Sequence, residues 1–159
     1  MDLGFFTTVL SESMYLILVF LFFFFYATFK GRQALIDLIF GLYLALLISI
    51  EFPYYEAIFG GGAGSESLIR LVLFAVFTIL ATLLFHRIMP DEFEEKKLES
   101  LGKKILLAAS ATILVMIFSF HVLPVTEFIT PGSPLNTLFG NAEYFFWWLI
   151  APLVLLYLV

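Results

Sequence analysis

The residues of this chain that could do chemistry in an apolar environment are few. The ionisable candidates are Asp37, Glu51, Arg70, Arg87 and His121. Each lies near the end of a long apolar stretch, and unpaired charges in such stretches are costly, so these groups are the default candidates for ion or proton transfer. A proton relay needs a series of such groups along the stretch, and the middle of every stretch is apolar. The pattern argues against a pump or a polar channel within one copy.

Ion pairing offers a structural interpretation of Asp37. Asp37 follows Arg32 by five residues, and Arg87 closes a neighbouring apolar stretch. Charges at helix ends usually hold neighbouring elements together or extend to the membrane surface. We expect Asp37 to pair with Arg32 or Arg87, and a functional role for Asp37 is the alternative.

A second group of polar residues lies at the opposite ends of the same stretches. Glu51 and Arg70 end and begin two successive stretches, so they can meet, unless Arg70 instead pairs with Glu66 four residues before it. His121 ends a further stretch. Structural roles are favoured for Glu51 and His121, with functional roles as the alternative.

Motifs for established chemistries are missing from the sequence. The chain has no cysteine and its two histidines lack zinc-enzyme spacing. The glycine-rich segment 60–65 lacks the Lys-Ser/Thr ending and preceding strand of a phosphate-binding loop, which favours a flexible linker. We therefore expect no catalytic residue, metal or cofactor, and the net charge of −5 indicates no nucleic-acid partner.

Composition places the chain in a membrane. Hydrophobic residues make up 62% and charged residues 13% of the chain, whereas a soluble domain has about half and a quarter. Five apolar stretches cover about 9–29, 34–50, 68–85, 105–122 and 144–159. A helix of about 20 residues crosses the hydrocarbon core, and only a helix satisfies its own backbone there. The last stretch contains Pro152 and has no polar flank, so four crossings are the alternative to five.

The distribution of basic residues predicts the orientation of the chain in the membrane. Seven of the eight Lys/Arg residues lie in two connections, and Arg70 is the exception. These seven are Lys30, Arg32, Arg87, Lys96, Lys97, Lys103 and Lys104. Basic connections stay on the cytoplasmic side, so the N-terminus is expected outside and the C-terminus inside. The chain is thus predicted to be a single-domain, all-α, polytopic transmembrane bundle.

Two connections carry helix signals of their own. In the cytoplasmic charged loop 87–104, acids follow Pro90 and lysines come later, which predicts a surface helix over about 91–100. This helix is solvated in the simpler interpretation and a docking element in the other. Ser133 followed by Pro134 predicts the start of a short outer helix that Gly140 stops near Phe139.

Small residues mark the expected helix contacts, because they let backbones approach closely in lipid. They are Gly41, Ala45, Ala75, Ala108 and Ala111. We expect the second, third and fourth stretches to form the tight centre of the bundle. The Phe-rich first stretch would then face lipid or a partner.

Two segments resemble the colicin V production protein (CvpA) family. Tyr26–Arg32 contains the Lys30-Gly31-Arg32 inner turn, and Ile36–Ala45 is a Gly-containing second helix that ends in small residues. The resemblance implies a multi-pass protein of the bacterial inner membrane associated with export and the cell envelope. It implies no catalytic residues.

Three functions remain open at this point. The first is a non-enzymatic accessory or scaffold subunit of an export or envelope system, bound to other membrane proteins or to its own copies. The alternative is a small oligomeric transporter or channel whose pathway between copies is lined by Asp37, Glu51 and His121. The least favoured is a membrane enzyme that acts on lipid-linked substrates around His86, Arg87 and Asp91.

Overall fold

A computed structural model shows an all-helical chain over the residues that it describes, 3–55, 66–89, 100–122 and 134–159. The helices are α1 (Leu3–Lys30), α2 (Arg32–Glu51), α4 (Glu66–Ile88), α5 (Ser100–His121), α6 (Pro134–Phe139) and α7 (Ala142–Leu158). Four of them, α1, α2, α4 and α5, are long and apolar enough to cross a membrane, and α7 is shorter. The predicted all-α class is confirmed.

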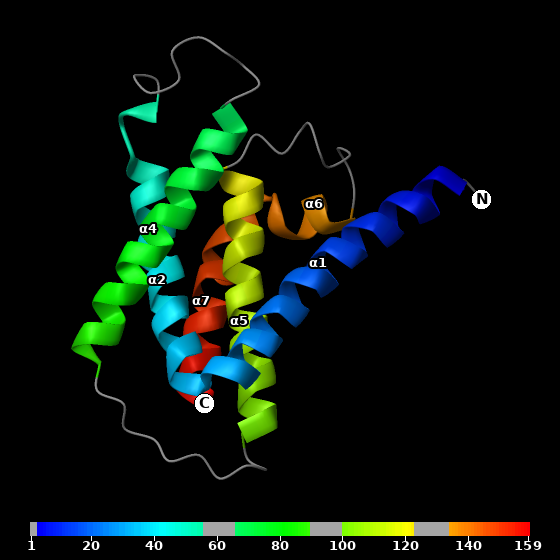
Figure 1. Ribbon diagram of the computed structural model, residues 1–159. Coiled ribbons are helices and arrows are strands. Elements are labelled where there is room, and N and C mark those ends of the chain that lie inside the picture. Colours follow the sequence, from blue (N-terminus) through cyan, green and yellow to red (C-terminus); the bar gives the residue numbers. More distant parts are fainter. Residues whose placement is uncertain (1–2, 56–65, 90–99, 123–133) are drawn as a thin grey trace.

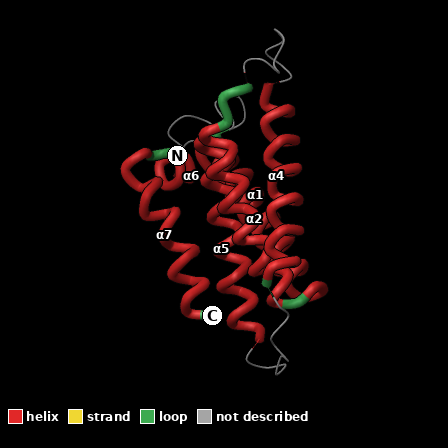
Figure 2. The backbone as a smooth tube through the Cα atoms, turned by 90° about the vertical axis from the view of Figure 1, so that its left-hand side faces the viewer, coloured by secondary structure: helices red, strands yellow, loops and turns green. Residues whose placement is uncertain are grey.

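Successive long helices run in opposite directions (Figures 1 and 2). The α1–α2 turn, the end of α4, the start of α5 and the C-terminus lie at one end of the bundle, and the N-terminus and α6 lie toward the other. The free half of α1 leans away from the bundle. Because the described basic residues of the two connections lie at the α1–α2 turn and at the ends of α4 and α5, we call this end the basic end.

A single residue separates α1 from α2. Gly31 has φ 91°, a region that side chains rarely adopt, and its N–H donates to Ala27 O at 3.1 Å. This geometry reverses the chain within one residue. The glycine between Lys30 and Arg32 is therefore required by the turn itself.

The closest helix contact joins α2 to α4. A Cβ atom built on Gly41 would lie 2.9 Å from the backbone nitrogen of Thr82 and 3.1 Å from its Cα. Ala45 and Ser49 follow Gly41 at four-residue intervals, and both are buried. The result is a continuous small-residue face along α2, and the sequence prediction had stopped at Ala45.

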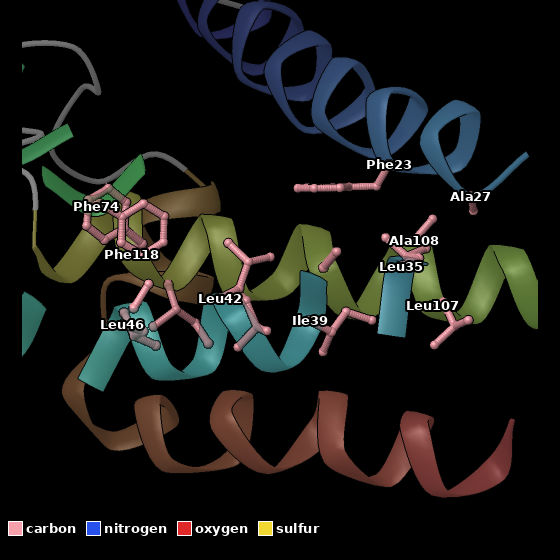
Figure 3. Packing of buried hydrophobic residues seen from close by; sticks show 14 of the residues in the cluster. Phe23, Ala27, Leu35, Ile39, Leu42, Leu46, Phe74, Leu107, Ala108 and Phe118 are labelled. Carbon is pink, nitrogen blue, oxygen red and sulfur yellow. The ribbon is translucent and has the colours of Figure 1, made fainter. Parts of the chain in front are cut away.

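The apolar core lies among α1, α2 and α5 (Figure 3). Leu107, Ala108 and Ala111 of α5 are fully buried. Phe118 of α5 stacks on Phe74 of α4, with ring centroids 3.5 Å apart. The core therefore depends on α5 as much as on α2.

The predicted centre of the bundle is wrong in one respect. Half of the α5 span and 44% of the α2 span are buried, but only 11% of the α4 span is. Ala75, expected to pack, is exposed because the helix turns about 100° per residue and Phe74 and Thr78 occupy the inner face. We conclude that α4 is a peripheral helix attached mainly to α2.

The short outer helix is observed as α6, and it ends where Gly140 was expected to stop it. The N–H of Gly140 bonds to Asn136 O at 2.8 Å, and the Asn141 side chain then caps α7 through the N–H of Glu143. In α7, Pro152 removes one backbone donor, and the Tyr43 hydroxyl of α2 donates to the nearby carbonyl of Leu149. This bond ties α7 to α2.

Several predictions concern residues outside the described part of the chain. These are the linker at 60–65, most of the helix over 91–100, and the Ser133 cap. The charged loop is shorter than predicted, because Arg87 belongs to α4 and Lys103 and Lys104 belong to α5.

The Gly41 contact gives the first prediction. Changing Gly41 to Ala should lower the free energy of unfolding by about 1–3 kcal/mol, because the new methyl group overlaps the Thr82 backbone. Changing Gly102 to Ala is the matched control, since its Cβ would meet nothing within 4 Å. The control should be neutral or stabilising by up to about 1 kcal/mol. Thermal unfolding in a mild detergent measures both, and equal stability of the two variants would contradict the close contact.

Candidate functional site

The most unusual polar group in the described structure is the buried carboxylate of Asp37, whose residue is 1% exposed. Its Oδ1 accepts a hydrogen bond from Gln33 Nε2 at 3.2 Å, and its Oδ2 accepts one from His86 Nδ1 at 3.0 Å. Gln33 lies one turn earlier on α2, and His86 lies in the last turn of α4. Both carboxylate oxygens are therefore satisfied across the α2–α4 contact.

The Asp37–His86 bond sets the state of the imidazole. Since the carboxylate accepts, Nδ1 carries the proton, and Nε2 is the remaining atom that can exchange protons or bind. His86 is 60% exposed at the basic end. Further along α2, the described ionisable side chains are Tyr43, whose hydroxyl bonds to Leu149 O, and Glu51 at the last residue of the helix.

In the described part of the chain, Asp37 bonds to His86 and not to either of the predicted partners, Arg32 and Arg87. His86 directly precedes Arg87, and one helical residue corresponds to about 100° of rotation. His86 therefore turns toward α2, and Arg87 is exposed. The sequence carried a usable signal for Gln33, which is four residues before Asp37 on one helix face, but none that distinguished His86 from Arg87.

Arg70 bonds to α5 rather than to Glu51. Its Nη1 donates to Val122 O at 3.0 Å, just beyond the end of α5, and its guanidinium lies 4.7 Å from the centre of the Tyr55 ring. A cation is favourable at this end of a helix, and the aromatic face adds to it. Glu51 is exposed at the last residue of α2. Arg70 thus joins the ends of α4 and α5 that lie opposite the basic end.

His121 holds α6 in place. Its Nε2 donates to Phe139 O at 2.9 Å, and its ring meets the edge of Phe145. From α7, Trp148 Nε1 donates to Leu138 O at 2.7 Å. The last carbonyls of a helix have no partner within it, so these two side chains complete the end of α6. This bonding is structural.

The three residues proposed to line a transport pathway do not converge within one copy. Asp37 and Glu51 are 14 residues apart on α2. At 1.5 Å per residue this is about 21 Å. His121 faces α6 instead. Among the described residues no group of three or more His, Cys, Asp or Glu side chains could hold a metal ion.

One polar link between distant residues carried no sequence signal. Tyr15 of α1 and Ser119 of α5 form a hydrogen bond at 3.2 Å across 104 residues of sequence. Ser119 also donates to Val115 O within its own helix. This bond fixes where α1 crosses the upper part of α5.

No protein-family model, curated protein or solved structure matches this chain.

The Asp37–His86 pair gives the second prediction. Changing His86 to Ala should lower the free energy of unfolding by about 1–3 kcal/mol, because Asp37 loses a hydrogen-bond partner at a buried site. Arg87 to Ala is the control and should cost about 0.5 kcal/mol or less, since Arg87 is exposed.

A double-mutant cycle isolates the pair. In an Asp37→Asn background, no buried charge is left unpaired, so His86→Ala should cost much less than in the native chain. Chemical unfolding in detergent measures all four proteins. An equal cost of His86→Ala in both backgrounds would show that the two side chains are not coupled.

Proposed function

We propose that this chain is a non-enzymatic, multi-pass protein of the bacterial inner membrane, similar to the CvpA family, that acts as an accessory or scaffold subunit of an export or envelope system. The observation that carries the proposal is the contrast between a closed interior and large apolar outer faces on α1 and α4. The buried polar groups described above form bonds that hold helices together. The outer faces are available to lipid and to other membrane proteins.

Two features support embedding with the N-terminus outside. Positive charge in the two connections is collected at the basic end, which is typical of the cytoplasmic side. Exposed aromatic residues lie near both ends of α7, with Tyr144 and Trp147 at one and Tyr157 at the other. Tyr144 and Tyr157 are about 20 Å apart along the helix, and aromatic side chains of this kind are enriched at membrane–water interfaces. Their presence at both ends supports α7 as a fifth crossing.

The scaffold role is supported by α1. Leu18, Phe22, Phe25 and Phe29 are exposed along one side of this helix. Among its described side chains, Phe23 and Ala27 belong to the buried core, and Val19, Phe20, Phe24 and Tyr26 pack partly buried against it. A helix that contributes so little to its own bundle has most of its surface free for contact with another membrane protein.

Topology is the third prediction. The chain has no cysteine, so single cysteines can be placed at will. With five crossings, a membrane-impermeant maleimide should label Glu143→Cys from outside intact spheroplasts and should label Tyr157→Cys only after permeabilisation. Both positions are exposed, which makes them a matched pair. Labelling of both variants in intact spheroplasts would reduce the count to four crossings, and labelling of Tyr157→Cys alone would reverse the orientation.

The partner is the fourth prediction. A mild-detergent pull-down from native membranes at endogenous expression, followed by mass spectrometry and native mass measurement, should recover foreign membrane proteins at stoichiometric amounts. An isolated monomer would count against a scaffold. A homo-oligomer alone would favour transport, and flux into liposomes that is lost in Asp37→Asn would then test that function.

A further inference from the structure

Four cations surround the place where three helices meet at the basic end. They are Lys30 of α1, Arg32 of α2, and Lys103 and Lys104 of α5. The junction of these helices is tight, since one or two core residues of each are 0% exposed. These core residues are Ala27, Leu35, Leu107 and Ala108 (Figure 3).

Helical register places the two lysines of α5 directly beyond the junction. Lys103 and Lys104 precede Leu107 and Ala108 by four residues each, which is about one turn on the same helix face. Side chains tilt toward the N-terminus of their helix, so these lysines extend away from the core toward the end of the bundle. Both are half-buried, and their charged groups are therefore held near the helix ends.

The α1–α2 turn supplies the other two charges at the same level. Lys30 follows Ala27 by three residues, and Arg32 precedes Leu35 by three, so each also lies about one turn beyond a core residue. The Gly31 turn keeps them on adjacent helix ends. Four positive charges thus come from three helices that pack against one another.

Arg32 and Lys104 already have interaction partners in the structure, and Lys30 and Lys103 lie beside them. Asp37 is buried and already accepts hydrogen bonds from Gln33 and His86. The C-terminal end of α7 lies at the same end of the bundle. Acidic residues in the segment 90–99, outside the described residues, are the competing source of negative charge.

We propose that Lys30, Arg32, Lys103 and Lys104 form a binding site for the phosphate of an anionic phospholipid headgroup at the inner surface. The proposal rests on the proposed membrane embedding, because only then does the basic end lie at headgroup level. Basic residues between transmembrane helices on this side recognise anionic headgroups. The bilayer supplies this ligand at a concentration that no soluble anion reaches.

Native mass spectrometry of the full chain tests the site. The protein is purified in a neutral detergent and titrated with dioleoylphosphatidylglycerol, with dioleoylphosphatidylcholine as the zwitterionic comparison. The native chain should retain phosphatidylglycerol preferentially. The double variant Lys103→Gln/Lys104→Gln should bind it about tenfold more weakly or worse.

The matched control is Lys96→Gln/Lys97→Gln, which removes the same two charges from the connection between α4 and α5. It should leave phosphatidylglycerol binding within about twofold of the native value if the site is local. Equal losses in both double variants would mean that binding follows total charge and would overturn the site. Equal retention of both lipids, or unchanged binding in Lys103→Gln/Lys104→Gln, would do the same.

Two further experiments distinguish a lipid headgroup from a soluble anion, and the headgroup site from the membrane proposal. Inorganic phosphate at millimolar concentration should fail to displace the lipid, and complete displacement would identify a soluble anion as the ligand instead. Carbonate extraction of native membranes tests embedding by itself. A chain that resists extraction but shows no lipid preference would contradict the headgroup site while leaving the membrane proposal intact.

Discussion

The close approach of α4 to α2 is the contact on which the arrangement of the bundle depends. Gly41, Ala45 and Ser49 make one side of α2 flat, so the backbone of α4 can lie against it. Leu35 and Leu42 lie about 100–120° further round the helix from Gly41 and belong to the apolar core with residues of α5. Lipid gives little hydrophobic driving force between helices, so association relies on such surface complementarity. Because α2 is shared by both contacts, a change on its small side displaces α4 without emptying the core.

A second constraint is that buried hydroxyl groups need hydrogen-bond partners. Most buried hydroxyl groups satisfy themselves by bonding to the carbonyl four residues earlier in their own helix, as Thr78, Ser110, Thr112 and Ser119 do. Thr82 differs, because its Oγ1 faces Gly41 and has no hydrogen-bond partner among the described residues. Its position between the flat face of α2 and the Asp37–His86 pair shows that close packing at this point outweighs one hydroxyl bond.

The sequence predicts what depends on local periodicity and chain reversal. The apolar stretches become α1, α2, α4 and α5, and the Pro134 and Gly140 signals correctly bound α6. Which helix face turns inward is harder, because helices that are apolar all round carry no periodic signal. Ala75 was therefore placed wrongly, and His86 could not be separated from Arg87 as the partner of Asp37. A preference between adjacent residues depends on rotation of a helix about its axis, which tertiary packing sets.

Contacts between distant segments escape sequence reasoning for a different reason. The hydroxyls of Tyr15 and Tyr43 reach Ser119 and the carbonyl of Leu149, and nothing in either local pattern indicates a partner more than 100 residues away. These bonds matter most for α1. At 28 residues it is about 42 Å long, and its part Ser13–Lys30 is long and apolar enough to cross a membrane. Two contacts set the angle of α1 to the bundle: the packing of Ala27 near its C-terminal end and the hydrogen bond of Tyr15 near its middle. The part of α1 before Tyr15 leans away from the bundle. A helix fixed along only part of its length can change its angle at little cost in buried area, so a partner that covers its Phe-rich side meets the least resistance there.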